Sequence, residues 1–320
     1  MTDPVSRSAR TLGLFAVVGS VMCFAISFGL IKWPGTDGSV IAWWRLVGSS
    51  LLWWVGLITL RVTQRRPLPS RDAWRQSMPA ALVFGLLIST LFTAVTRTSV
   101  AHAEFIASLA PLLTIPAGFV FFHERPQWTA LRWGALSVVG IVIVLFFGPD
   151  QGVATLGGDL LMILVLLFSV SYLLTAKRAR SRGVTTFDFM AILMPVALVS
   201  ATPVALVVAG DQLWPLSGRA WIAVGLLSVL TGGLAHGLQF FAHRSVPLGT
   251  ISTVVVSQPA MSVFWAWVIV GEEITRVQVP GMALVIVGMS LVVWFSQRPD
   301  PTRGPAAGAA IPATRGRPAH

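Results

Sequence analysis

Apolar blocks of about 20 residues recur along the whole chain, and each is long enough to cross a hydrocarbon core about 30 Å thick as a helix. Short polar or basic stretches separate them. Only 11% of the residues are charged, whereas 55% are hydrophobic. The sequence therefore predicts an all-α integral membrane protein with ten transmembrane helices. They are expected near residues 12–32, 40–60, 77–96, 99–122, 129–148, 157–176, 188–209, 220–242, 247–270 and 277–295.

The basic residues between the blocks predict the orientation in the membrane. With a cytoplasmic N-terminus, 17 Lys and Arg residues fall in the inner segments and only four, Lys32, Arg97, Arg219 and Arg276, in the outer ones. Short loops rich in Lys and Arg stay in the cytoplasm. We therefore expect a multi-pass protein of the plasma membrane with both termini cytoplasmic. Topology and lipid headgroups explain the net charge of +11, so membrane lipids are expected partners and nucleic acid is not.

The two ends of the chain are short of apolar residues. Residues 1–11 form a basic cytoplasmic start, and the block that follows lacks a small-residue cleavage site, so we expect a retained first helix rather than a cleaved signal. Residues 296–320 are rich in Pro, Gly, Ala and Arg, a composition typical of a disordered cytoplasmic tail. The single cysteine, Cys23, excludes an intrachain disulfide and a cysteine metal cluster.

Two parts of the chain, 12–148 and 157–295, are predicted to be copies of one repeat. Residues of the same type recur at offsets of 145 to 148. The matched pairs are Gly13 and Gly158, Lys32 and Lys177, Arg97 and Arg244, Pro111 and Pro259, Glu124 and Glu272, and Gly140 and Gly288. Because five helices is an odd number, the second copy must enter the membrane from the other side. Inverted repeats let a transporter present one midplane site to either side, although a duplication that served only folding is an alternative.

Pro111 and Pro259 are predicted to lie near the middle of the fourth and ninth helices. A proline removes a backbone hydrogen bond and can kink a helix, which leaves carbonyl groups free to meet a substrate or water. Prolines in membrane helices also serve packing alone. Because these two prolines occupy matching repeat positions, a functional hinge is expected as readily as a role in packing alone.

The stretches SLAPLLTIPAGFVFFHERPQWTALRWGALSVVGIVIV (108–144) and VSQPAMSVFWAWVIVGEEITRVQVPGMALVIVGMSLVV (256–293) share a helix with a central proline, a closing glutamate and a helix with glycines. This pattern resembles the ends of EamA domains, the repeat unit of the drug/metabolite transporter superfamily. The resemblance covers two copies and nearly the whole chain except the tail. It implies a ten-helix secondary carrier with a central cavity formed by the first four helices of each repeat, and with the fifth and tenth helices more peripheral. Such carriers move amino acids, sugars, nucleotide-like metabolites or drugs, often outwards.

Glu104 departs from this family pattern, in which a small or uncharged residue is expected. A charge at the centre of a membrane helix costs about 2.5–3.5 kcal/mol, so it needs an aqueous cavity or a partner. Helical spacing places Glu104 on one face with Ser108 and Pro111, and places Arg45 among small residues of the second helix. Both lie about 8 Å below the outer boundary by helical rise. We expect them to face one cavity, either at a substrate site or as an ion pair that locks the two helices.

A polar stripe on the eighth helix is the second candidate wall of this cavity. Its residues, at spacings of three or four, are Ser228, Gly232, His236, Gln239 and His243. A lone buried histidine usually serves packing. Because His236 belongs to a whole polar stripe, a functional role is expected as readily as a packing role. Near Pro259, the ninth helix can supply hydrogen bonds from Thr253, Ser257 and Gln258.

Three other ionisable residues are expected to be structural. His102 lies two residues from Glu104 and hence on another side of the helix, so the pair is a poor metal site and His102 is interpreted as an interface residue. Glu124 and Glu272 close helices on opposite sides of the membrane, where they are expected to cap or bond the start of an adjacent helix. We expect neither a metal nor another cofactor.

The sequence contains no G-x-x-x-x-G-K-[ST] phosphate loop, so transport must draw on a gradient or on another energised subunit. We expect that the protein is not an enzyme. We expect a secondary active transporter, which exports a small amino acid-like metabolite or a drug-like solute by alternating access. Protons that titrate Glu104, or the substrate's own gradient, are expected to drive it. The alternatives are a membrane enzyme acting on lipid-linked substrates and a channel, whose flux would not saturate. The candidate pathway residues are Arg45, Glu104, Ser108, Pro111, His236, Gln239, Gln258 and Pro259.

Overall fold

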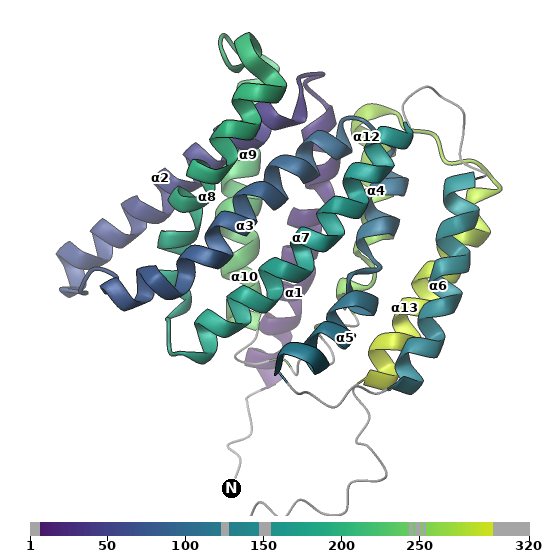
Figure 1. Ribbon diagram of the computed structural model, residues 1–320, viewed down its shortest axis with the longest axis horizontal. Coiled ribbons are helices and arrows are strands. Elements are labelled where there is room, and N and C mark those ends of the chain that lie inside the picture. Colours follow the sequence, from purple (N-terminus) through teal and green to yellow (C-terminus); the bar gives the residue numbers. More distant parts are fainter. Residues whose placement is uncertain are drawn as a thin grey trace, which may run out of the picture.

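The structure is a computed structural model that describes residues 7–122, 128–146, 155–242, 246, 251 and 254–296. These residues form helices joined by short turns (Figure 1). Eight helical spans within the described residues, some made of more than one helix, are long and apolar enough to cross a membrane, judged by length and composition. Two shorter apolar helical stretches, Arg132–Val144 and Gln258–Val270, accompany them.

The helices follow one another with few long connections. In chain order they are α1 (Arg7–Lys32), α2 (Gly38–Gln64), α3 (Arg71–Val95), α4 (Val100–Ala107), α5 (Ala110–Phe122), α6 (Trp128–Phe146), α7 (Leu156–Ser181), α8 (Thr186–Ala209), η1 (Gly210–Leu213), α9 (Gly218–Val229), η2 (Leu230–Leu234), α10 (Ala235–Ala242), α12 (Gln258–Val270) and α13 (Gln278–Ser296). The element η1 is a 3₁₀ turn, and η2 is a single π-helical turn.

Each predicted membrane segment overlaps a helix, but two of them are interrupted within the described residues. The fourth is split into α4 and α5, and the eighth contains the π-turn η2 between α9 and α10. The ninth, predicted over 247–270, is described without gaps only from residue 254. Several predictions lie outside the described residues, namely those for residues 1–6, the tail from 297 onwards, Glu124, His243, Arg244 and Thr253.

Polar side chains in the turns determine where the helices begin. The carboxylate of Asp37 accepts the backbone N–H of Ser39 at 2.8 Å at the start of α2. The Ser99 hydroxyl accepts the N–H of His102 at 3.1 Å at the start of α4. Such caps satisfy N–H groups that have no partner inside the helix. Hydroxyls cap four further helices in the same way, through Ser70, Thr155, Thr185 and Ser217.

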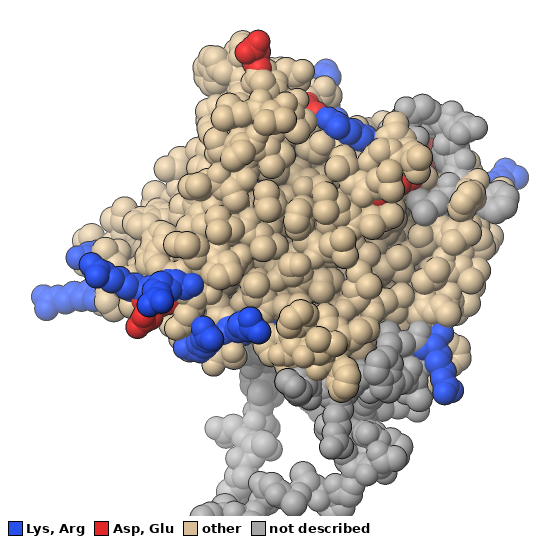
Figure 2. All heavy atoms as spheres, viewed as in Figure 1, with Lys and Arg blue, Asp and Glu red and all other residues tan. Residues whose placement is uncertain are grey.

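On the face shown in Figure 2, residues other than Lys, Arg, Asp and Glu cover the side of the bundle, whereas charged side chains gather toward its ends. On α2, for example, Leu51, Val55, Ile58 and Val62 are all exposed. A broad apolar belt of this kind is expected of a protein whose sides contact lipid. We call the end of the bundle where α1 stops the Lys32 end; α3 and α12 also stop there, and α2, α4, α7 and α13 start there.

Helices from the two halves of the chain pack on one another throughout the bundle. Helix α3 packs against α7 and α8, and α1 packs against α12 and α10. At one edge α6 and α13 form a close pair (Figure 1). A Cβ atom on Gly140 would lie 2.5 Å from the carbonyl oxygen of Gly281, so only glycine allows this approach. The position of α6 and α13 agrees with the peripheral place that the resemblance implies for the fifth and tenth helices.

Candidate functional site

Two helices are broken beside the matched prolines. Residues 108–109 form a turn between α4 and α5, and residues 256–257 form a turn before α12. Pro111 and Pro259 are each the second residue of the helix that follows. A proline is favoured there because the first turn of a helix does not need its N–H. Pro111 therefore lies near the middle of the apolar span Val100–Phe122, as predicted, but the span is broken there into α4 and α5 instead of continuing as one kinked helix. Pro259 likewise lies beside a break, as the second residue of α12.

Glu104 is buried on α4, with only 3% of its surface exposed. One carboxylate oxygen, Oε1, accepts a hydrogen bond from the Ser262 hydroxyl and a second from Nε2 of Gln258 at 3.3 Å. Both donors lie in the first turns of α12, where the positive end of the helix dipole also favours a negative charge. Glu104 thus connects the short helix α4 of the first half to the start of α12 in the second half.

Arg45 is also buried, with 2% of its surface exposed, in the interior of α2. Its Nε donates a hydrogen bond of 2.9 Å to the Thr231 hydroxyl in η2, and its guanidinium carbon lies 5.6 Å from the centre of the Phe92 ring. The Nη1 atom is buried and has no hydrogen-bond partner among the described residues. The side chain therefore brings a cation into the bundle with only part of its donor capacity used.

Arg45 and Glu104 were expected to pair, but the structure gives them different partners. Among the residues that the structure describes, no ion pair within 4.0 Å involves either side chain. Arg45 contacts the π-turn η2, whereas Glu104 contacts α12. Equal depth along two helices does not bring side chains together when each helix turns its polar residue toward a different neighbour.

The π-turn η2 lies against one stripe of α2. Trp53 Nε1 donates a hydrogen bond of 2.7 Å to the carbonyl of Gly232. A Cβ atom at Gly232 would lie 2.0 Å from the Ser49 hydroxyl, so α2 and η2 meet closely here. Because Arg45, Ser49 and Trp53 are four residues apart, all three face this turn. π-turns of a single repeat occur frequently at functional sites.

The predicted stripe of the eighth helix contacts α2 and α1 in part. The Ser228 hydroxyl donates to the carbonyl of Arg45 at 3.3 Å, and Gly232 contacts Ser49. The His236 ring lies 5.6 Å from the Phe24 ring of α1, and its Nδ1 is buried without a hydrogen-bond partner in the described part of the chain. Gln239 lies half-buried on α10. The stripe thus lies at the junction of α2, η2 and α1.

One further predicted residue is Ser108, whereas three residues that contact the two buried charges were not predicted. Ser108 lies in the turn between α4 and α5, where its hydroxyl donates to the Phe105 carbonyl at 2.6 Å. Sequence reasoning missed Ser262, Thr231 and Phe92, which contact the two buried charges. Ser262 could have been found, since it follows Gln258 by four residues and so shares its face of α12. Thr231 could not, because the π-turn changes the helical spacing around it.

Charged residues are paired at the Lys32 end of the bundle. Lys32 forms an ion pair with Glu272, and its Nζ also donates to the carbonyl of Thr98 at 2.7 Å. The second carboxylate oxygen of Glu272 accepts the backbone N–H of Val100 at 2.8 Å, at the start of α4. The prediction that Glu272 bonds the start of an adjacent helix is confirmed. This ion pair joins the end of α1 to the end of α12.

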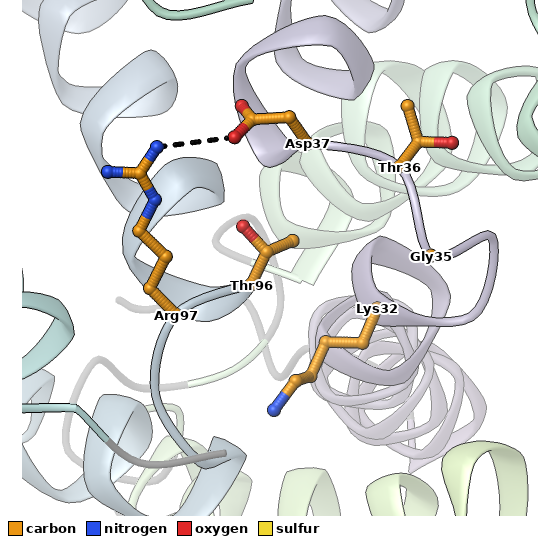
Figure 3. Close-up of a pocket in the computed structure, with 6 residues that line it drawn as sticks. All are labelled: Lys32, Gly35, Thr36, Asp37, Thr96 and Arg97. Carbon is orange, nitrogen blue, oxygen red and sulfur yellow. Dashed lines mark hydrogen bonds and ion pairs between the residues drawn. The ribbon is translucent and has the colours of Figure 1, made fainter. Parts of the chain in front are cut away.

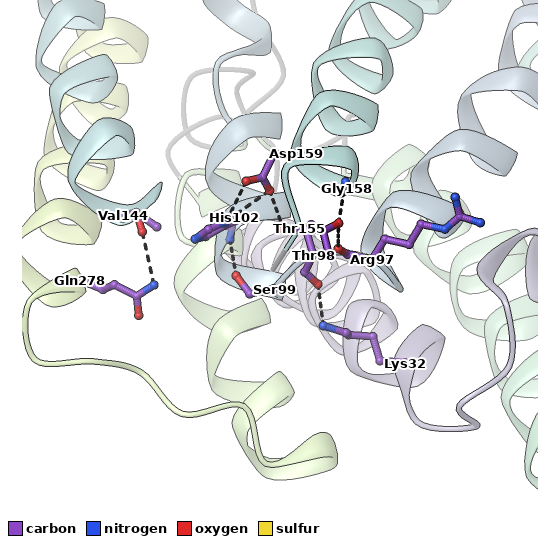
Figure 4. A network of polar contacts seen from close by, with 10 residues as sticks. All are labelled: Lys32, Arg97, Thr98, Ser99, His102, Val144, Thr155, Gly158, Asp159 and Gln278. Carbon is purple, nitrogen blue, oxygen red and sulfur yellow. Dashed lines mark hydrogen bonds and ion pairs between the residues drawn. The ribbon is translucent and has the colours of Figure 1, made fainter. Parts of the chain in front are cut away.

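A second polar contact joins the two halves at this end (Figure 4). His102 Nδ1 lies 3.2 Å from each carboxylate oxygen of Asp159, and the Thr98 hydroxyl donates to the same carboxylate at 2.5 Å. His102 is therefore an interface residue, as predicted, between α4 and α7. With Lys32, these residues form a continuous polar network across the Lys32 end.

A pocket of about 280 Å³ opens at the same end. Its lining residues are Lys32, Gly35, Thr36, Asp37, Thr96 and Arg97. Arg97 and Asp37 face each other across it at 3.3 Å (Figure 3). All six lining residues belong to the first half of the chain. The charges of Arg97 and Asp37 are paired with each other. In the described ranges, no three His, Cys, Asp or Glu side chains are grouped so that they could hold a metal ion.

Comparisons with known proteins agree with this architecture. The model of the EamA-like transporter family matches residues 11–146 and 156–294. The threonine/homoserine exporter RhtA of Salmonella typhimurium is 28% identical over 169 residues, which is 52% of this chain and 55% of that protein. RhtA of Escherichia coli K12 is 27% identical over the same length. The chain thus spans about half the length of these curated relatives.

Two further matches cover more of the chain. The S-adenosylmethionine/S-adenosylhomocysteine transporter of Chlamydia trachomatis is 22% identical over 304 residues, 90% of this chain and 91% of that protein. A crystal structure of a protein with 18% sequence identity has a TM-score of 0.59 over 92% of this chain and all of that one, which shows the fold alone. The family match covers both halves of the chain, and the resemblance seen in the sequence is confirmed. The chain is a multi-pass membrane protein that belongs to the EamA-like transporter family.

Proposed function

We propose that the protein is a secondary active transporter that exports a small amino acid-like or drug-like solute across the plasma membrane by alternating access. The observation that carries this proposal is the contact of Glu104 with Gln258 and Ser262. It places a buried carboxylate between two broken helices, one from each half. Broken helices at the interface of two repeats are where carriers of this kind hold their substrates and coupling ions.

The proposed topology has ten spans, arranged as two inverted repeats of five. It counts the eight long helices together with the shorter stretches in α6 and α12. Of the basic residues, Lys32, Arg97, Arg219 and Arg276 belong to the Lys32 end, whereas the turns between α2 and α3 and between α7 and α8 are richer in arginine. The positive-inside rule then puts the Lys32 end outside and both termini in the cytoplasm.

The proposed substrate pathway runs through the residues near the two buried charges. These are Arg45, Glu104, Ser108, Pro111, His236, Gln239, Gln258 and Pro259. The two prolines allow α5 and α12 to change direction, and the polar side chains contact the solute. The named substrates of RhtA and of the S-adenosylmethionine transporter all contain an α-amino acid group. A solute with one carboxylate and one ammonium group matches a site that offers one buried cation and one buried anion.

Alternating access requires the contacts at the Lys32 end to separate when that end opens. The Lys32–Glu272 and His102–Asp159 contacts both join one half of the chain to the other. They hold the ends of α1 and α4 against α12 and α7, so the proposed cavity is closed on this side. When the Lys32 end opens, both contacts must break and their polar groups must bind water instead. When the opposite end opens, the two contacts can stay intact.

The proposed coupling ion is a proton that Glu104 exchanges during the cycle. Its carboxylate has hydrogen-bond donors but no cation within 4.0 Å in the described residues, so a proton or a cationic group of the solute can neutralise it. Reconstituted protein in liposomes with a pH-sensitive dye should show proton flux linked to amino acid flux. Glu104→Gln should abolish the linked proton flux, whereas Asp72→Asn, at an exposed carboxylate of α3, should not. Wild-type coupling in Glu104→Gln would remove the proton role.

A channel and a membrane enzyme are the competing functions. A carrier shows saturable uptake and counterflow, in which excess unlabelled solute on one side drives labelled solute against its gradient. Flux that neither saturates nor shows counterflow would favour a channel. Release of a modified product from a lipid-linked substrate would favour an enzyme.

A further inference from the structure

The guanidinium of Arg45 is the least satisfied charge in the described interior. Only 2% of its surface is exposed, Nε is bonded to Thr231, and Nη1 has no hydrogen-bond partner in the part of the chain that the structure describes. The other nearby group is the face of the Phe92 ring, a weak electrostatic partner. A buried charge is strongly unfavourable unless an opposite charge or hydrogen bonds compensate it. An arginine needed only for packing would be replaced by an apolar side chain without loss.

Two further polar atoms at the same junction have no hydrogen-bond partner among the described residues. The Ser49 hydroxyl lies one helical turn after Arg45 on α2, and it approaches Gly232 of η2. His236 Nδ1 lies one turn beyond Gly232 on α10. In the described part of the chain, three side chains from two helical segments thus have buried hydrogen-bonding atoms without a protein partner beside one π-turn. Buried polar atoms are normally satisfied by protein groups, ordered water or a bound ion, so these three can bind a polar ligand.

The chemistry of the three groups fits an anion. A guanidinium offers parallel N–H donors that match the two oxygens of a carboxylate, and a serine hydroxyl can donate alongside it. An imidazole can donate from Nδ1 in the appropriate tautomer. Glu104, the nearest acidic candidate in the sequence prediction, is bonded to α12 instead.

We propose that Arg45, together with Ser49 and His236, binds the carboxylate of the transported solute at the junction of α2 with η2. The inference rests on the proposed transport function and adds the chemical class of the group recognised there. Arg45 supplies the charge, and Ser49 and His236 orient the carboxylate. Thr231 holds the guanidinium by its Nε, which leaves the Nη side for the solute. The site therefore requires a carboxylate and rejects the corresponding amide.

The test compares acids with their amides as probes. Protein in lipid nanodiscs is titrated with L-threonine, L-homoserine, acetate and benzoate, and with the amides of the two amino acids, and the rise in unfolding temperature is measured. Wild type should be stabilised by carboxylates and not by amides. In Arg45→Gln carboxylate binding should be weaker by on the order of 100-fold, as expected when one partner of a buried charge pair is lost. Arg66→Gln, at an arginine that already pairs with Asp188, is the matched control and should respond like wild type.

Two more variants keep the test decisive if Arg45→Gln folds poorly. Arg45→Lys keeps the charge but loses the two-pronged geometry, so it should keep a reduced response to carboxylates. Ser49→Ala should weaken carboxylates by about tenfold or less, in line with the loss of one hydrogen bond. Equal stabilisation by acids and amides, a full carboxylate response in Arg45→Gln, or no response of wild type to any carboxylate would each overturn the proposal. The transport function fails by a different result, the absence of saturable counterflow, so the two failures are distinguishable.

Discussion

Charged side chains at the Lys32 end of the bundle have partners of a different kind from those of the charged side chains in its interior. At the Lys32 end, Lys32 pairs with Glu272, Arg97 pairs with Asp37, and His102 contacts Asp159. In the interior, Arg45 and Glu104 have only neutral hydrogen-bond partners among the described residues. The interior charges are the more deeply buried, at 2% and 3% exposed, and so should have the greater need of partners.

This difference separates charges that hold the fold from charges that await a solute. A paired charge at a helix end fixes two elements together, and its loss leaves the partner unsatisfied. An interior charge with neutral partners adds little to the fold but provides a group that a solute can neutralise. Substitutions at the Lys32 end should therefore reduce stability, whereas those at the interior charges should reduce solute binding.

The largest effect on stability is expected at the paired end. Glu272→Gln leaves Lys32 without a counter-charge and weakens the acceptor of the Val100 N–H, so it should lower the free energy of unfolding by about 2–3 kcal/mol, less than for a fully buried pair. Thermal unfolding in nanodiscs measures this loss. Asp211→Asn, at an exposed carboxylate of η1, is the control and should unfold like wild type. Wild-type stability of Glu272→Gln would show that the ion pair does not hold α1 and α12 together.

An intermediate effect is expected where α2 meets the π-turn. Gly232→Ala places a methyl group 2.0 Å from the Ser49 hydroxyl, so it should cost about 1–3 kcal/mol and impair solute binding. Gly233→Ala is the matched control, because a Cβ atom at Gly233 has no neighbour within 4 Å. Adding Ser49→Gly to Gly232→Ala should recover stability but not carboxylate binding. Recovery of both would exclude Ser49 from the binding site.

The smallest effect is expected at Trp53. Trp53→Phe removes the hydrogen bond to the Gly232 carbonyl and should cost about 1 kcal/mol. Trp54→Phe removes an equivalent bond to Ala191 of α8 and should cost about the same. Only Trp53→Phe should reduce the rate of amino acid transport, since only Trp53 supports the π-turn. Equal transport rates in the two variants would argue that the π-turn is structural alone.

The architecture was largely readable from the sequence, and the side-chain partners were not. Twenty-residue apolar blocks and the EamA-like stretches led directly to a helical bundle in the right family, because hydrophobic length and repeat spacing are properties of the chain itself. The contact of Glu272 with the start of an adjacent helix was also predicted from its position, although that helix is α4 of the first half and not the next helix along the chain. Which neighbour a polar residue meets depends on how each helix is rotated and tilted in the bundle, and periodicity within one helix does not fix that.

The helix breaks show the same limit. The prolines at 111 and 259 predicted a kink in each helix, and the structure has a break beside each, with the proline as the second residue of the helix that follows. A complete break, as opposed to a kink, was not predicted. The π-turn η2 contains no proline, and its sequence did not predict a change in helical geometry. Its consequence was the missed contact between Arg45 and Thr231, and hence the incorrect pairing of Arg45 with Glu104.

The most direct test of the difference between the two regions is the thermal unfolding of Arg45→Met and Lys32→Met in nanodiscs without added solute. Each variant replaces one long basic side chain with methionine. Arg45→Met should unfold at or above the wild-type temperature, because it removes a buried charge and leaves no opposite charge unpaired. Lys32→Met should unfold several degrees lower, because it leaves Glu272 unpaired. If Arg45→Met is destabilised as much as Lys32→Met, the interior arginine holds the fold together and is not a charge kept for a solute.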